Sequence, residues 1–189
     1  WSDIGLVHAR LGRFDRAIAS YDKALALKPD LVGAHYNRGD ALMDLGRSDE
    51  AIASYDEALA VKPDYVDALV NRGNALAVLR RLEEALASYD RALALTPDYG
   101  EALVNRGNAL KALRRVDEAL ESYDEALALR PEFLGALVNR ANALEELGRH
   151  YDALESYDEA LALDPDQPKP VLKRCNALHQ MHRPPEALE

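Results

Sequence analysis

The chain has 189 residues, 33 of them acidic and 23 basic, so its formal net charge is −10. This length suits one domain or two, and a hydrophobic share of 48 % is normal for a folded protein. The acidic balance argues against a general nucleic-acid-binding role, because such proteins concentrate basic side chains against phosphates. No uncharged stretch reaches ten residues, so we expect no membrane insertion. A single cysteine, Cys175, excludes an internal disulfide framework.

The sequence repeats with a period of 34 residues, which is typical of helical repeat proteins. Five prolines keep this step: Pro29, Pro63, Pro97, Pro131 and Pro165. Five tyrosines keep it too: Tyr21, Tyr55, Tyr89, Tyr123 and Tyr157. Six alanines follow the same spacing: Ala17, Ala51, Ala85, Ala119, Ala153 and Ala187. A fourth series holds small residues: Gly5, Gly39, Gly73, Gly107, Ala141 and Cys175.

Each period predicts two amphipathic helices. In residues 66–99, apolar side chains at helical spacing predict a first helix over Asp67–Leu79. A break follows at Arg80, where other repeats carry glycines suited to the left-handed residue that ends a helix. A second helix is predicted over Glu83–Leu95, and Pro97 prevents its continuation. One such pair cannot bury its own apolar stripe, so the pairs must stack.

This register resembles the tetratricopeptide repeat (TPR) family, with a small residue at position 8, alanine at 20 and 27, tyrosine at 24 and proline at 32. Trp1 falls on the tryptophan position of that family. The resemblance implies an all-α fold, a right-handed superhelix (α-solenoid) of antiparallel helix pairs. We expect one domain over 1–189, with partial repeats at 1–31 and 168–189. Full repeats are expected at 32–65, 66–99, 100–133 and 134–167.

Two charged series depart from the usual TPR pattern. Position 7, usually leucine in the family, is arginine in five repeats: Arg38, Arg72, Arg106, Arg140 and Arg174. Each has an aspartate 16 residues upstream, in the preceding repeat: Asp22, Asp56, Asp90, Asp124 and Asp158. We expect these pairs to form a ladder of ion pairs between repeats, from Asp22–Arg38 to Asp158–Arg174. The alternative is that both series are solvated and persist through duplication.

A series of asparagines is the candidate functional surface. In TPR proteins the first helix of each pair lines the concave groove, and positions 6 and 9 face it. Position 6 holds Asn37, Asn71, Asn105 and Asn139, and position 9 holds Asp40, Asn74, Asn108, Asn142 and Asn176. An amide both donates and accepts hydrogen bonds, so a regular array suits the backbone of an extended peptide. The pattern is similar to the asparagine ladder in the TPR region of O-GlcNAc transferases and SPINDLY-type proteins. The alternative is that the amides bond neighbouring repeats.

A second candidate lies at the C-terminal end. The pattern Asn108, Asn139, Lys169 and Lys173 is similar to four of the five positions of the carboxylate clamp in co-chaperone TPR domains, with Val104 replacing the first lysine. That resemblance implies an acidic peptide tail. Acidic residues elsewhere on the predicted groove, such as Asp44 and Glu101, together with the net charge, instead favour neutral or basic peptides. Val70, Val104 and Val138 are expected to flank the amides.

No arrangement of residues predicts catalysis, a cofactor or a metal site. Cys175 and His179 are four residues apart, but Cys175 occupies a small-residue packing position and is expected to be buried. We therefore expect a cytoplasmic binding module for a protein or peptide, without nucleic acid. Because the chain begins with Trp1, we expect it to be part of a longer protein. Two alternatives are the substrate-recognition arm of a larger glycosyltransferase and a structural solenoid that forms homodimers through its terminal repeats.

Overall fold

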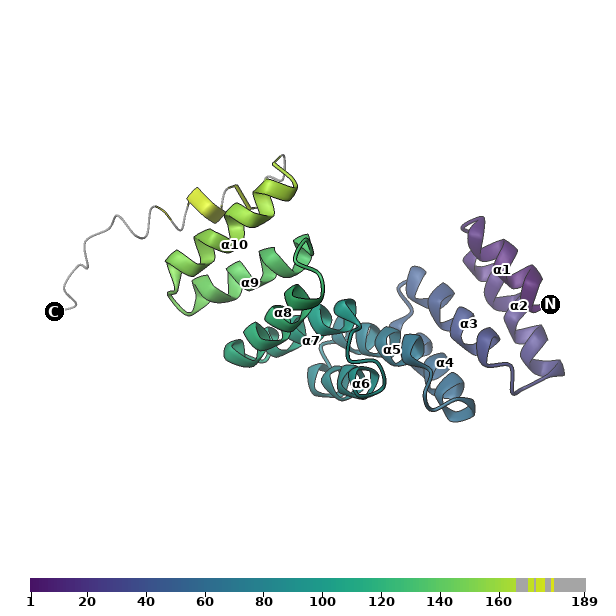
Figure 1. The fold of residues 1–189 in the computed structure, drawn as a ribbon. Helices are drawn as coiled ribbons and strands as arrows, with labels where there is room; N and C mark the ends of the chain where they lie inside the picture. The colour runs from purple at the N-terminus through teal and green to yellow at the C-terminus, as the bar shows by residue number, and fades with distance from the viewer. Residues whose placement is uncertain (166–169, 172, 176–177, 179–189) are drawn as a thin grey trace. The chain divides into compact units, whose positions relative to one another are not determined.

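The computed structural model describes residues 1–165, 170–171, 173–175 and 178. Between Ser2 and Leu163 the chain is helical, as expected, and forms ten helices joined by short turns (Figure 1). They are α1 (Ser2–Arg10), α2 (Phe14–Leu27), α3 (Val32–Asp44), α4 (Ser48–Val61), α5 (Val66–Val78), α6 (Leu82–Leu95), α7 (Gly100–Ala112), α8 (Val116–Leu129), α9 (Leu134–Glu146) and α10 (His150–Leu163). Most of the expected partial repeat 168–189 lies outside the described residues.

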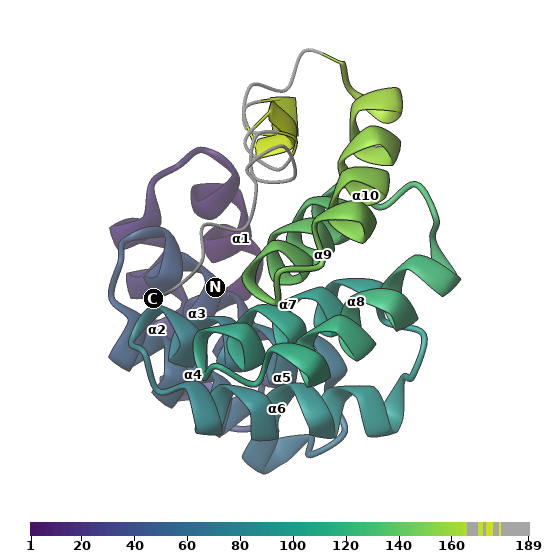
Figure 2. The ribbon, with the colours of Figure 1, turned by 90° about the vertical axis from the view of Figure 1, so that its left-hand side faces the viewer.

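The chain divides into two compact units, Trp1–Pro97 with α1 to α6 and Asp98–Glu189 with α7 to α10. Within each unit the odd-numbered helix packs against the even-numbered helix that follows it, and the pairs stack on one another (Figure 2). Successive first helices also touch, α1 with α3 and α3 with α5 in one unit, and α7 with α9 in the other. We call the surface formed by the first helices of a unit its first-helix face.

The turn inside each pair needs a left-handed residue. The backbone angle φ is 66° at Gly12, 72° at Gly46 and 73° at Gly148. Arg80 and Arg114 occupy the same place with φ of 61° and 67°, although side chains disfavour this conformation. The break predicted at Arg80 is therefore confirmed, and the observed helices around it agree with the predicted ones to within one residue at each end.

In the four helix pairs from α1–α2 to α7–α8, a tyrosine packs against a glycine, which has no side chain. A Cβ atom added at Gly73 would lie 2.5 Å from the Tyr89 ring, and Gly5, Gly39 and Gly107 meet their own tyrosines at the same distance. All five repeated tyrosines are at most 1 % exposed. The 34-residue spacing of glycine and tyrosine thus encodes one contact, repeated along the chain, that brings the two helices of a pair close together.

The ladder of ion pairs is confirmed for four of its pairs. Arg38 Nε lies 2.7 Å from Asp22 Oδ1, and the distance is 2.6 Å for Arg72–Asp56 and for Arg140–Asp124. Arg174 pairs with Asp158 in the same way. The fifth pair, Asp90 and Arg106, is divided between the two units and stays a prediction.

A buried serine completes three of these contacts, which the sequence did not predict. Arg72 Nη1 donates to Ser88 Oγ at 2.7 Å, and Ser88 Oγ donates to the Glu84 backbone carbonyl at 3.0 Å. Ser54, Ser122 and Ser156 bond to their arginines in the same way. Arg38, Arg72 and Arg140 therefore each link the second helix of the preceding repeat to the second helix of their own repeat. Because the pairs are partly exposed, we expect each to contribute only about 0–1 kcal/mol.

Two expectations from the sequence are wrong. Val70 and Val104 do not flank the groove, since they are 4 % and 7 % exposed and belong to the core. Cys175 is exposed rather than buried.

Candidate peptide-binding face

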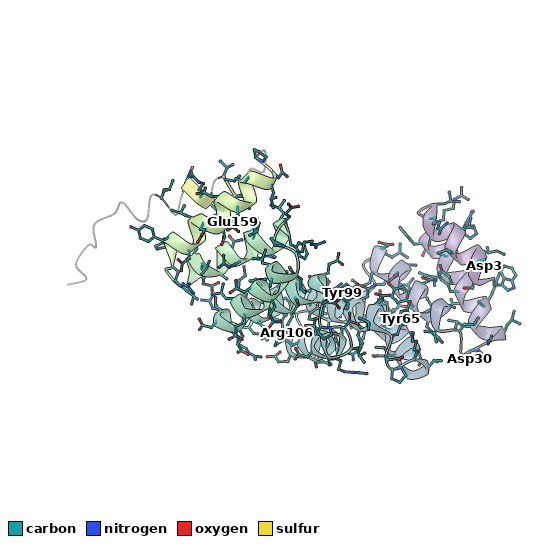
Figure 3. All side chains as sticks on the ribbon, in the orientation of Figure 1. Asp3, Asp30, Tyr65, Tyr99, Arg106 and Glu159 are labelled. Atoms are coloured by element: carbon teal, nitrogen blue, oxygen red, sulfur yellow. The ribbon has the colours of Figure 1, made fainter. Side chains whose placement is uncertain are left out.

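The predicted site residues lie on the first helices, as the register requires: Asn37 on α3, Asn71 and Asn74 on α5, Asn105 and Asn108 on α7, and Asn139 and Asn142 on α9. Asn108 is exposed, and the others are half-buried. Asn176 and Lys169 lie outside the described residues. Figure 3 draws the side chains as sticks and labels Arg106, which directly follows Asn105 on α7.

The side chains at position 9 accept a hydrogen bond from the tyrosine 15 residues further on. Tyr89 Oη donates to Asn74 Oδ1 at 2.8 Å, and Tyr123 Oη donates to Asn108 Oδ1 at 2.8 Å. The same bond joins Tyr157 to Asn142 at 2.9 Å and Tyr55 to Asp40 at 2.8 Å. Burial raises the pKa of Tyr89 and Tyr123, so these hydroxyls remain protonated donors. Each tyrosine therefore fixes the orientation of an amide or a carboxylate.

The sequence analysis did not predict this contact. The signal was present in the constant offset of 15 residues between an amide or carboxylate and a tyrosine. Once the tyrosine holds Oδ1, the NH₂ group of the amide points away from it. Asn108 and Asn142 make no other hydrogen bond to residues that the structure describes.

The position 6 amides differ in their contacts. Asn71 Nδ2 donates to Asp40 Oδ1 at 2.9 Å and to Tyr36 Oη at 3.0 Å, so it bonds the preceding repeat. Asn37 and Asn139 have no hydrogen bond within the described parts of the chain. Asn105 does have an interaction partner, as does Asn74 at position 9. The alternative role in bonding neighbouring repeats is thus observed at Asn71.

Charge is paired on the first-helix face of the second unit. Lys173 Nζ lies 3.5 Å from Glu145 Oε2, and Arg114 pairs with Glu146. Lys111 is half-buried there, and this burial lowers its pKa. Lys173 therefore already has a carboxylate partner, which reduces its attraction for an acidic peptide tail.

In the first unit, a cavity of about 260 Å³ opens on the first-helix face. Its lining residues come from α3, α4 and α5: Asp40, Met43, Asp44, Tyr55, Asn71 and Asn74. Asp40 is half-buried. Burial raises the pKa of its carboxyl, and hydrogen bonds from Tyr55 and Asn71 offset part of that rise. In this cavity, α3 contributes the carboxyl groups of Asp40 and Asp44, and α5 contributes the amides of Asn71 and Asn74.

The first repeat breaks the tyrosine pattern. Tyr21 is fully buried, but the residue 15 positions before it is Leu6, which has no acceptor. Tyr21 Oη consequently has no hydrogen-bond partner among the described residues. Burial raises the Tyr21 pKa, and the charge of Asp40 raises it further.

Two further findings concern the described residues as a whole. None of their helices combines the length and apolar character that crossing a membrane requires. Their His, Cys, Asp and Glu side chains form no group of three or more placed to hold a metal ion.

Comparison with known proteins identifies the repeats. A tetratricopeptide repeat family model matches residues 36–100 and 104–168, and a TPR repeat model matches residues 5–46. Among curated proteins, none matches the chain.

Several solved structures are similar. The crystal structure of MamA is 27 % identical, with a TM-score of 0.83, covering 89 % of this chain and 99 % of that one. YrrB, described as a TPR protein with an unusual peptide-binding site, is 26 % identical, with a TM-score of 0.77 and coverage of 95 % and 89 %. A thermophilic TPR protein from Thermus thermophilus is 25 % identical, with a TM-score of 0.70 and coverage of 94 % and 97 %.

Proposed function

Because the chain belongs to the tetratricopeptide repeat family, we propose that it is a protein-interaction scaffold whose first-helix faces bind an extended peptide by its backbone. The observation that carries the proposal is the orientation of Asn108 and Asn142. Tyr123 and Tyr157 hold their carbonyl oxygens, which leaves the NH₂ groups to donate to peptide carbonyls. An amide held in place before binding loses little conformational freedom when the peptide arrives.

The spacing of these donors suits an extended chain. Packed helices lie about 8–10 Å apart, and α7 and α9 are in contact. A polyproline II peptide rises about 3.1 Å per residue and returns to the same side every three residues. Successive amides would therefore meet every third peptide carbonyl. Since these bonds involve backbone groups, they select an extended conformation more than a sequence. The proposed ligand is a neutral or basic peptide, in keeping with the net charge of −10.

The test is a nonapeptide library titrated onto the chain and onto the double variant Asn108→Ala/Asn142→Ala. We expect the variant to lose at least tenfold in affinity, because two hydrogen bonds at about 1 kcal/mol each are removed. The control is Tyr123→Phe/Tyr157→Phe, which removes the hydrogen bonds from these tyrosines to Asn108 and Asn142 but keeps both amides. Equal binding by the wild type and the alanine variant, at equal helical content, would assign the amides a purely structural role.

A second candidate is self-association through α1. Trp1, Ile4 and Val7 are about half exposed, at 53 %, 46 % and 56 %. Where α1 has Val7, the repeats that follow carry alanines that are at most 3 % exposed. A second copy of the chain would cover this apolar strip. Light scattering should then give twice the monomer mass for the wild type and the monomer mass for Val7→Asp; a monomeric wild type would reject this candidate.

A further inference from the structure

The cavity on the first unit differs from the rest of the asparagine series in its charge. Position 9 is an amide at Asn74, Asn108 and Asn142, but it is a carboxylate at Asp40. Asp40 accepts the same tyrosine bond as the amides do, from Tyr55 at 2.8 Å. An asparagine would serve the scaffold equally well here, so the fold does not require the negative charge.

The surroundings of Asp40 suit a cation. The cavity of about 260 Å³ has a second carboxylate, Asp44, and none of its six lining residues is basic. Met43 supplies apolar surface for an alkyl chain.

Tyr36, which bonds to the lining residue Asn71, stands at the centre of an aromatic cluster. Its ring centroid lies 5.0 Å from that of Tyr65 and 6.0 Å from that of Tyr55. Aromatic faces near carboxylates favour ammonium and guanidinium groups.

Asn37 adds a polar group on α3, the helix that carries Asp40 and Asp44. It is half-buried and makes no hydrogen bond in the described part of the chain. An amide both donates and accepts hydrogen bonds, so Asn37 suits the backbone of a peptide whose side chain enters the cavity.

We propose that this cavity is a specificity subsite that takes the side chain of a lysine or arginine from the bound peptide. The cationic head pairs with Asp40 and Asp44, and the alkyl stem lies on Met43. Asn37 donates to the backbone beside it. The inference rests on the proposed function and deepens it, since the amides hold an extended backbone of any sequence, whereas this subsite selects one basic residue within it.

The experiment uses a positional-scanning nonapeptide library in which each position in turn is fixed as lysine, arginine, glutamine or glutamate. The variant is Asp40→Asn, which restores the amide of the other repeats and keeps an acceptor for Tyr55 and Asn71. The control is Asp64→Asn, which removes the same charge at an exposed residue outside the cavity. Both variants are compared with the wild type by fluorescence anisotropy.

In the wild type, one library position should prefer a basic residue over glutamine by about tenfold, the size expected for a charge-assisted hydrogen bond. Asp40→Asn should remove this preference, whereas Asp64→Asn should keep it. The lysine and arginine arms show which cation fits better. A library bound without a basic preference, or a preference that survives in Asp40→Asn, overturns the subsite and leaves the proposed function standing. A library that does not bind at all overturns both.

Discussion

At the residue scale, the repeated tyrosine occurs in two environments, with and without a hydrogen-bond partner. Comparing them measures what its hydroxyl contributes to stability. Tyr89 donates to Asn74, whereas Tyr21 has no partner among the described residues. Both rings are at most 1 % exposed and pack against a glycine at the same distance. The two side chains therefore differ in hydrogen bonding far more than in packing.

Tyr89→Phe should lower the free energy of unfolding by about 1 kcal/mol, because a hydrogen bond is lost and the Asn74 oxygen loses its donor. Tyr21→Phe should leave stability unchanged or raise it by about 1 kcal/mol, because it removes an unsatisfied buried hydroxyl. Urea unfolding followed by circular dichroism measures both. Equal losses in the two variants would mean that the hydroxyl bond to position 9 contributes nothing.

The environment of Asp40 should make the stability of the protein depend on pH. Burial raises its carboxyl pKa above the usual value, with Asp44 on the same helix raising it further and donors on α4 and α5 lowering it. The folded state then holds the proton more tightly than the unfolded state does. The carboxylate consequently lowers stability as the pH rises from the ordinary aspartate pKa to the raised one.

Asp40→Asn removes this penalty. Its stability advantage over the wild type should be absent in acid, should grow as the pH rises through that window, and should be constant at neutral pH. Urea unfolding across the acidic range measures the advantage, with Asp64→Asn as the control for net charge. An advantage that is greatest in acid and vanishes at neutral pH would show that the carboxyl pKa is lowered instead.

At the element scale, the turns between paired helices contain an avoidable strain. Arg80 has φ of 61°, where glycine is the favoured residue. Its side chain is exposed, so little packing is lost when it is replaced. Arg80→Gly should therefore raise the free energy of unfolding by about 1 kcal/mol, the left-handed penalty for a residue with a side chain.

The reverse substitution is the matched control. Gly46→Arg, at φ of 72° in the preceding repeat, should lower stability by a similar amount. An added Cβ at Gly46 meets nothing within 4 Å, so a clash does not contribute to that loss. If Arg80→Gly destabilises the chain, the arginine makes a contact that outweighs its backbone strain.

At the scale of the whole molecule, repetition made most of the fold predictable. The 34-residue register predicted the contact of Arg72 with Asp56, because the offset of 16 residues between the two series is constant. The site was less predictable. The tyrosine hydroxyl can serve packing and hydrogen bonding at once, and spacing alone did not show that it bonds to Asn74.

Irregular positions were the hardest to predict. Val70 shares a helix with the groove amides, yet a difference in helical phase of one residue from Asn71 is enough to bury it in the core. Cys175 occupies the small-residue position of the register, yet it is exposed. The cavity beside Asp40 depends on side chains from three helices, and such a convergence has no single spacing in the sequence.

The most direct measurement of the central claim is nuclear magnetic resonance of the asparagine side chains while the nonapeptide library is titrated. If the first-helix amides grip a peptide backbone, the NH₂ signals of Asn108 and Asn142 shift in step with saturation, as expected for new hydrogen bonds to carbonyls. The claim is contradicted if binding saturates while both signals stay in place and the perturbed resonances lie on the second helices.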